Sequence, residues 1–176
     1  MTYIILFAGF GGQGVLFSGK LTAYAALIEN KEVSWLPSYG PEMRGGTANC
    51  SVIVSDSPIG SPLVLEPNIL IAMNGPSLDK FEKSVEPGGV IIVDSTLVTR
   101  KVKRDDVKAF YVDATRIASE HDLKGLANVI IMGKMLKETN FTTLDILKKS
   151  VEKCVPPRKA HLIEANIKAI EEGMKL

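Results

Sequence analysis

The hydrophobic pattern of this chain alternates between short, almost wholly apolar runs and longer segments with apolar residues at helical spacing. Short apolar runs predict strands buried on both faces of a sheet, and they occupy residues 3–8, 68–73, 90–93 and 109–112. The helical segments are residues 15–30, 76–85, a short stretch from 114, then 126–137, 144–154 and 160–174. This alternation predicts a three-layer α/β/α single domain with a largely parallel, mixed sheet and a Rossmann-like first β-α unit.

Two further strands have less regular patterns. Residues 33–36 predict a short second strand that Pro37 ends, and residues 47–55 alternate polar with apolar positions, which places that strand nearer a sheet edge. Residues 58–62 predict a turn that begins a hairpin. Residues 142–145 resemble a capping box with Asp in place of Glu, and so predict the start of a helix.

Composition and charge narrow the class of protein. A chain of 176 residues fits one domain spanning 1–176, and a formal net charge of +1 gives no electrostatic basis for binding nucleic acid or an acidic membrane. No apolar run is long enough to span a bilayer, and the first residues lack the basic start of a signal peptide. We therefore expect a cytoplasmic protein without a membrane partner.

Few side chains suggest a metal or a catalytic centre. Cys50 and Cys154 are far apart in sequence, and two thiols alone hold neither an iron–sulfur cluster nor a structural zinc. His121 and His161 have no further ligands at metal spacing. Asn128 lies early in an apolar helix, where a hydrogen-bonded core amide explains it better than a cleft residue does. We expect no metal site in this chain.

The first apolar run leads directly into a glycine turn. Gly9, Gly11 and Gly14 have the G-x-G-x-x-G spacing of phosphate-binding turns, with Gly12 and Gln13 between them. Glycine permits positive φ and lets an anionic ligand approach the backbone, and the following helix offers unpaired N–H groups. The turn therefore predicts a ligand site, and the alternative is a tight corner whose glycines only permit close packing of helix and strand.

A dinucleotide site requires one residue that this chain lacks. Dinucleotide-binding folds place Asp or Glu at the end of the second strand, about 20 residues after the turn, to hold the adenosine ribose. Residues 36–38 are Leu-Pro-Ser, while Glu29 and Glu32 precede the strand at its wrong end. The missing acid disfavours binding of NAD by the chain alone.

A second loop, at residues 37–46, places charged and aromatic side chains among turn-forming residues. It contains Tyr39, Glu42 and Arg44 and ends in Gly45 and Gly46. A planar guanidinium beside two glycines can hold a phosphate or a carboxylate in a bidentate pair. The alternative is a surface loop with a local ion pair, and the residues alone do not decide between the two.

Together these segments resemble a known family. The turn at 9–14, the loop at 38–46, and Ser-Pro at 61–62 ahead of Pro-Asn at 67–68 closely resemble the gamma subunit of 2-oxoacid:ferredoxin oxidoreductases. The resemblance covers essentially the whole chain, and the pairing of G-x-G-G-Q-G with Y-G-x-E-x-R-G-G is more specific than either motif. Residues 47–50 resemble the 2-oxoglutarate or 2-ketoisovalerate types more than the pyruvate type.

The resemblance implies an activity that needs other subunits. The reaction is oxidative decarboxylation of a 2-oxoacid with coenzyme A, giving acyl-CoA, carbon dioxide and reduced ferredoxin, or the reverse. The implied partners are alpha and beta subunits that bind thiamine diphosphate with Mg, a ferredoxin-like delta subunit or domain with iron–sulfur clusters, and ferredoxin. This chain has neither a cysteine cluster nor a recognisable thiamine-binding motif. It is therefore expected to bind no cofactor alone and to supply no catalytic residue by itself.

The resemblance also implies which residues complete the shared site. The glycine turn and the second loop would face the alpha–beta active site near CoA or thiamine diphosphate, with Arg44 as a charged contact that Glu42 orients. The predicted cofactor-binding residues are Gly9, Gly11, Gly12, Gln13, Gly14, Tyr39, Glu42, Arg44, Gly45 and Gly46.

Three other hypotheses remain at this point. One is a standalone nucleotide-binding redox or regulatory module that uses the glycine turn directly. Another is an architectural subunit whose second loop contacts only protein. Within the family, the small subunit of an indolepyruvate-type ferredoxin oxidoreductase shares this type of domain.

Overall fold

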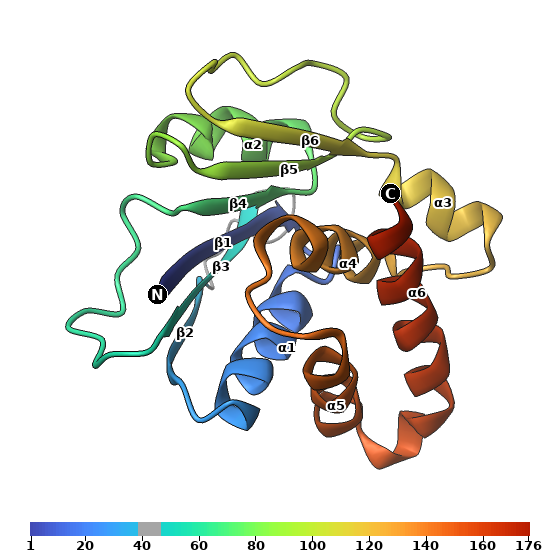
Figure 1. Ribbon diagram of the computed structural model, residues 1–176. Coiled ribbons are helices and arrows are strands. Elements are labelled where there is room, and N and C mark those ends of the chain that lie inside the picture. The colour runs from blue at the N-terminus through green and yellow to red at the C-terminus, as the bar shows by residue number, and fades with distance from the viewer. Residues whose placement is uncertain (39–46) are drawn as a thin grey trace.

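The computed structural model describes residues 1–38 and 47–176 (Figure 1). The described residues form a six-stranded sheet in the order β2-β3-β1-β4-β5-β6. Its strands are β1 (Thr2–Phe10), β2 (Glu32–Ser38), β3 (Thr47–Ser55), β4 (Ile69–Ala72), β5 (Val90–Asp94) and β6 (Lys108–Val112). Each apolar run that predicted a buried strand forms a strand, although β6 lies at an edge of the sheet and is only partly buried.

Most neighbouring strands run parallel. β4 pairs in parallel with both β1 and β5, and β5 pairs in parallel with β6. β3 is antiparallel to both of its neighbours, β1 and β2. The prediction of a largely parallel, mixed sheet is therefore confirmed.

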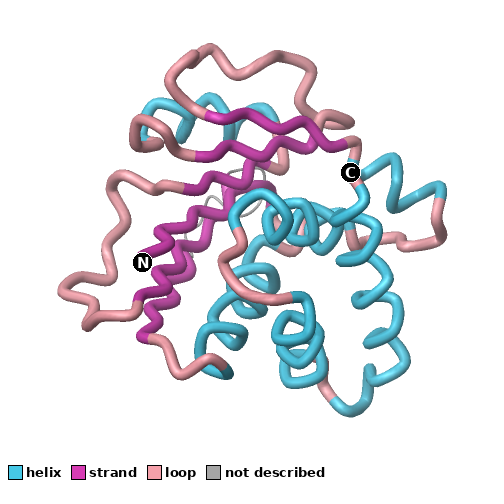
Figure 2. The backbone as a smooth tube through the Cα atoms, in the orientation of Figure 1, coloured by secondary structure: helices cyan, strands magenta, loops and turns pink. Residues whose placement is uncertain are grey.

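Helices cover both faces of the sheet unequally (Figures 1 and 2). They are α1 (Val15–Ile28), α2 (Gly75–Phe81), α3 (Ala114–Glu120), α4 (Ala127–Thr139), α5 (Leu144–Cys154) and α6 (Ile163–Lys175), with 3₁₀ turns η2 (Glu82–Ser84) and η3 (Pro157–Leu162). Within the described ranges, no helix combines the length and hydropathy needed to cross a membrane.

The central strand shows how the sheet divides the core. Side chains alternate between the faces of a strand, so Ile5 and Phe7 join the large cluster beneath α1, α4, α5 and α6. Leu6 and Ala8 join a smaller cluster with Leu78 of α2. The fold is the expected three-layer α/β/α arrangement, with one layer reduced to a short helix and loops.

The second strand is longer than the sequence predicts. β2 continues through Pro37, which pairs with Cys50 of β3, instead of ending there. β2 is an edge strand, and an edge position tolerates a residue that cannot donate a backbone hydrogen bond. The more alternating strand, β3, lies one position inside that edge.

Two local predictions were wrong. Residues 58–62 begin no hairpin, because the connection 56–68 contains no strand. The capping residue of α5 is Thr143, whose hydroxyl accepts from the N–H of Ile146. The Thr142 hydroxyl instead donates a hydrogen bond to Oε2 of Glu29, with 2.8 Å between the two oxygens. This tertiary contact cannot be predicted from the local sequence pattern.

Helices α4 and α6 cross at two glycines. A β-carbon on Gly133 would overlap the backbone carbonyl of Ile170, and one on Gly173 would overlap that of Ile130. Backbone atoms cannot move aside as a flexible side chain can, so the close approach of the two helices depends on both glycines.

We predict that Gly133→Ala destabilises the isolated chain by roughly 1–3 kcal/mol, the usual cost of overpacking, even though alanine favours helix formation. Denaturant unfolding followed by circular dichroism measures the change. Gly60→Ala is the matched control, because a β-carbon there meets no atom within 4 Å. Equal stability of both variants would show that the crossing is not tight.

Candidate functional site

The glycine turn connects the end of β1 to the start of α1. Gly12 and Gly14 both adopt left-handed backbone conformations, with φ of 92° and 77°. Gly14 is the N-cap of α1, and no side chain caps that helix end. The sequence therefore correctly predicted a strand, a glycine turn and a helix in this order.

The Gln13 side chain links this turn to the end of β4. Its Oε1 accepts from the Phe10 N–H at 2.6 Å and from Asn74 Nδ2 at 3.0 Å. Its Nε2 donates to the carbonyl oxygen of Met73 at 3.1 Å. We call these three hydrogen bonds the Gln13 clasp. They engage both ends of the amide inside the chain, which makes Gln13 a positioning residue for the turn.

The clasp spans a topological switch point. After β1 the chain enters α1 in the larger helical layer, whereas after β4 it enters α2 on the opposite face. Adjacent parallel strands whose helices leave to opposite sides open a crevice at their carboxyl ends, which is where doubly wound sheets bind ligands. The glycine turn therefore lies where a ligand site is expected.

The glycines of the turn have different roles. A β-carbon on Gly9 would lie 2.8 Å from Gln13 Oε1, and one on Gly14 would lie 2.5 Å from Asn128 Nδ2. These two glycines permit close packing of helix and strand, as the alternative interpretation of the turn predicted. A β-carbon on Gly12 meets nothing within 4 Å, so the backbone there is open to a ligand.

Asn128 is a core amide, as predicted. It is buried, and its Nδ2 donates to the carbonyl oxygen of Gly14 and to the hydroxyl of Ser18, each at 3.1 Å. It therefore holds the first turn of α1 against α4 and does not line an open cleft.

A cavity of about 330 Å³ opens beside the turn in the crevice. Its lining combines the turn with the ends of β4 and β5 and the α3–α4 region: Gly12, Gln13, Met73, Leu97, Thr115, Ala118, Ser119, Lys124, Gly125 and Ala127. We call it the switch-point pocket. Sequence reasoning missed its residues beyond the turn, because they come from separate segments that form no linear motif.

Asp94 fixes one wall of the switch-point pocket. Its carboxylate is fully buried at the end of β5, where it accepts the hydroxyl of Thr115 at 2.5 Å and the N–H of Thr96 at 3.1 Å. These bonds attach the start of α3 to the sheet. They also commit the Thr115 hydroxyl to the protein and leave it unavailable to a ligand.

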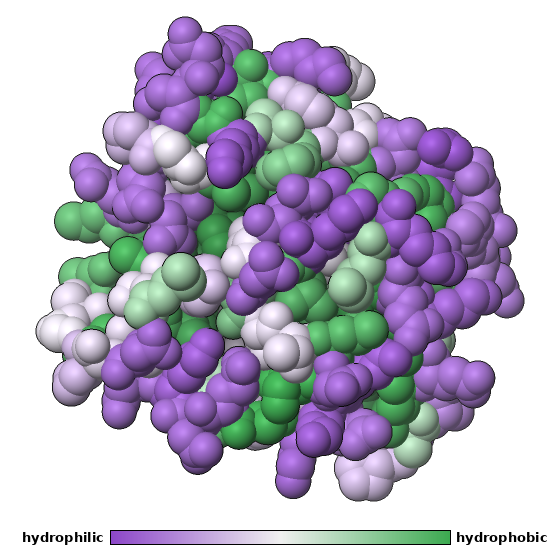
Figure 3. Space-filling view, viewed as in Figure 1, coloured by the Kyte–Doolittle hydropathy of each residue, from purple (hydrophilic) through white to green (hydrophobic). Residues whose placement is uncertain are grey.

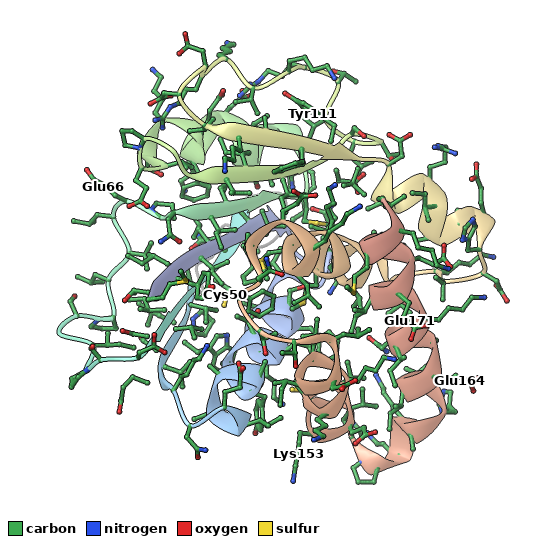
Figure 4. All side chains as sticks on the ribbon, in the orientation of Figure 1. Cys50, Glu66, Tyr111, Lys153, Glu164 and Glu171 are labelled. Carbon is green, nitrogen blue, oxygen red and sulfur yellow. The ribbon has the colours of Figure 1, made fainter. Side chains whose placement is uncertain are left out.

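The cysteines are unsuited to hold iron or another metal. Cys50 lies between the sheet and the helical layer (Figure 4). Burial raises the pKa of its thiol to about 12, and burial likewise raises the pKa of Cys154 to about 11. Across residues 1–38 and 47–176, no group of three or more His, Cys, Asp or Glu side chains could hold a metal ion. This part of the chain does not fit an iron–sulfur cluster.

Five of the predicted site residues lie outside the described residues. They are Tyr39, Glu42, Arg44, Gly45 and Gly46, and their roles stay predictions. The flanking strands nevertheless place the two ends of their loop: Ser38 pairs with Asn49, and Thr47 pairs with Phe10 of β1. Ser38 and Thr47, which flank residues 39–46, therefore lie at the end of the sheet that carries the glycine turn.

Fold and site together define an α/β protein with a glycine turn at a topological switch point and no metal centre in its described part. The sequence matches the family described as pyruvate ferredoxin/flavodoxin oxidoreductase over residues 4–176. The chain belongs to this family.

Individual relatives agree with that assignment. The chain is 37% identical over 175 residues to a 2-oxoglutarate synthase subunit, KorC, of Methanocaldococcus jannaschii, covering 98% of this chain and 92% of the relative. It is 41% identical over 169 residues to a ketoisovalerate oxidoreductase subunit, VorA, of Methanothermobacter thermautotrophicus. That match covers 94% of this chain but only 34% of the relative, so the chain spans about a third of VorA.

A solved structure shares the fold along the whole chain. The gamma subunit of a keto/oxoacid ferredoxin oxidoreductase from Geobacter sulfurreducens superposes with a TM-score of 0.85 at 31% identity. The match covers 98% of this chain and 96% of that subunit. The resemblance to gamma subunits, and to 2-oxoglutarate and ketoisovalerate types among them, is confirmed.

We predict that Gln13→Leu lowers the unfolding free energy of the isolated chain by about 1–3 kcal/mol, because it removes the three hydrogen bonds of the clasp, two of which are partly buried. Gln13→Glu keeps the acceptor atoms but cannot donate to Met73, so its loss should be smaller. Thermal and urea unfolding of the three proteins test the order. Wild-type stability in the leucine variant would mean that the clasp does not hold the turn.

Proposed function

We propose that this chain is the gamma subunit of a 2-oxoacid:ferredoxin oxidoreductase complex, and that residues 1–176 form one gamma-type domain. The reaction converts a 2-oxoacid, CoA and oxidised ferredoxin to acyl-CoA, carbon dioxide and reduced ferredoxin. The observation that carries the proposal is the near end-to-end match to a 2-oxoglutarate synthase subunit, which covers 98% of this chain and 92% of that protein. The relatives favour 2-oxoglutarate or a branched-chain 2-oxoacid as substrate.

Partner subunits carry the cofactors in this proposal. Thiamine diphosphate, held with Mg by the alpha and beta subunits, supplies the decarboxylation chemistry, and a ferredoxin-like delta subunit or domain holds the iron–sulfur clusters and passes electrons to ferredoxin. The buried, free thiols of Cys50 and Cys154 agree with a reducing cytoplasmic location.

The role of this chain is to complete the active site. The glycine turn and the switch-point pocket would form one wall that positions CoA and excludes water while the acyl group is transferred. The residues that flank positions 39–46, Ser38 and Thr47, lie at the end of the sheet that carries the glycine turn, and this supports a role for Arg44 at that wall. Its guanidinium would contact an anionic group of CoA or thiamine diphosphate, with Glu42 orienting it.

We predict that Arg44→Ala lowers acyl-CoA formation by the reconstituted complex at least ten-fold while the subunits still assemble, because it removes one charge-assisted contact. Arg158→Ala, on the exposed η3 turn, is the control. Steady-state kinetics and size-exclusion chromatography separate activity from assembly. If assembly and acyl-CoA formation both remain at control levels, the loop has no such role.

Exposed leucines on the β3–β4 connection support docking of a partner subunit. Leu63 and Leu65 are 67% and 80% exposed, and they border an open groove whose floor includes Ile4 and Ile53. Figure 3 shows hydrophobic residues among hydrophilic ones on this side of the molecule, close to Glu66, which Figure 4 labels. The matched segment makes up 34% of VorA, so in that protein it is joined to additional polypeptide about twice as long as itself. We propose that the alpha and beta subunits, which bind thiamine diphosphate in this proposal, cover these leucines.

We predict that Leu63→Asp with Leu65→Asp weakens co-purification of this chain with its thiamine-binding partner at least ten-fold, because each buried leucine contributes about 1.5–3 kcal/mol. Leu27→Asp is the matched control, because Leu27 is 53% exposed and lies in the last turn of α1. The isolated double variant should keep wild-type circular dichroism. Undiminished co-purification of a folded double variant would place the interface elsewhere.

A further inference from the structure

The groove beside the β3–β4 connection has a volume of about 690 Å³ and is largely apolar. Leu63 and Leu65 border it and are mostly exposed, whereas Ile53 in its floor is buried. The two leucines therefore present carbon surface to solvent beside an apolar floor. A contiguous apolar surface of this kind is typical of a site where another protein binds.

Hydrogen bonds fix the end of this connection to the sheet. The side chain of Asn68 accepts from the Ile4 N–H at 2.8 Å and donates to the carbonyl oxygen of Thr2 at 3.1 Å. The Glu86 N–H donates to the carbonyl oxygen of the buried Pro67 at 3.0 Å. The groove is therefore formed by the fold of the chain itself, before any partner binds.

Two carboxylates give the groove a negative charge. Glu66 and Glu86 both line it, and the bond to Pro67 holds Glu86 next to the residue that follows Glu66. Glu86 is half-buried, whereas Glu66 is exposed and lies just before β4 at the border of the molecule (Figure 4). No side chain in the described ranges pairs with either carboxylate, and no Lys or Arg is among the described residues that line the groove. We call it the acidic groove.

The charge of the acidic groove restricts what can cover it. A protein that covers Leu63 and Leu65 also removes water from Glu86, which is already half-buried. An ionised carboxylate that loses its water without gaining a cation destabilises the complex. The covering surface must therefore bring a basic side chain together with apolar ones.

A second copy of this chain does not meet that requirement. In a two-fold contact the same surface meets itself, so the carboxylates of Glu66 and Glu86 from both copies would face one another. The described lining holds no cation to offset their repulsion. The acidic groove therefore favours a different protein surface.

We propose that the acidic groove binds a segment of the thiamine-binding subunits in which a basic side chain lies next to apolar ones. The apolar side chains pack against Leu63 and Leu65, and the basic side chain pairs with Glu86 and Glu66. This inference rests on the proposed function, which takes the alpha and beta subunits as the partners that cover the leucines. It adds the charge that the partner carries at this place, and it makes association dependent on salt.

The test measures binding of the full chain to the alpha and beta subunits at two salt concentrations. The double variant Glu66→Gln with Glu86→Gln keeps the shape of both side chains and removes their charge. In about 0.1 M NaCl it should bind about ten-fold more weakly than the wild type, mainly through slower association. In about 1 M NaCl the Debye length falls from about 10 Å to about 3 Å, so the difference should shrink to about two-fold.

A second double variant controls for the change in net charge. Glu152→Gln with Glu164→Gln removes two exposed carboxylates from α5 and α6, which lie on the other face of the sheet. It should bind like the wild type at both salt concentrations. Equal weakening of both double variants, or wild-type binding by Glu66→Gln with Glu86→Gln, would overturn this inference and leave the proposed function standing.

Sedimentation of the chain alone separates the remaining cases. Any self-association should be the same in the wild type and in Glu66→Gln with Glu86→Gln. A dimer that the two substitutions strengthen would place a second copy in the acidic groove and overturn the inference. If the wild-type chain does not bind the alpha and beta subunits at either salt concentration, the proposed function fails and this inference fails with it.

Discussion

The side-chain amide of Gln13 connects the parts of the structure on which the candidate site depends. It accepts from Phe10 and Asn74 and donates to Met73, so one residue ties the glycine turn to the ends of both β1 and β4. Asn128 secures the other side of the turn through Gly14 and Ser18. The position of Gly12, and with it one rim of the switch-point pocket, follows from these two amides.

Much of the fold could be predicted because local pattern and burial agree along most of the chain. The apolar runs at residues 3–8 and 90–93 lie in the sheet interior, where few other structures would bury them. The failures occur where tertiary contacts decide the outcome. β2 continues through Pro37 because it lies at the sheet edge, and Thr143 caps α5 because Thr142 is bonded to Glu29.

The candidate site could be predicted only in part, for a similar physical reason. Gly9 to Gly14 are consecutive, so their spacing alone indicated a turn at the end of a strand. The pocket beside them needs Met73, Leu97 and residues 115–127, which only the sheet order brings together. Sequence also did not show that Gln13 bonds within the chain, or that Gly9 and Gly14 serve packing. The loop at 39–46 lies outside the described residues, and its role rests on the family resemblance.

The unequal covering of the sheet connects the fold to a subunit role. One face carries α1, α4, α5 and α6, whereas α2 is the only helix that the described residues contribute to the clustered core of the other face. Exposed leucines lie on the thinner side, beside a groove with Ile4 and Ile53 in its floor. This arrangement agrees with the proposal that the chain completes a site formed together with partner subunits. The most direct measurement is acyl-CoA formation, coupled to ferredoxin reduction, by the thiamine-binding and ferredoxin-like partners with and without this chain. Our account predicts loss of turnover without the chain and recovery when it is added back, whereas full turnover by the partners alone would contradict it.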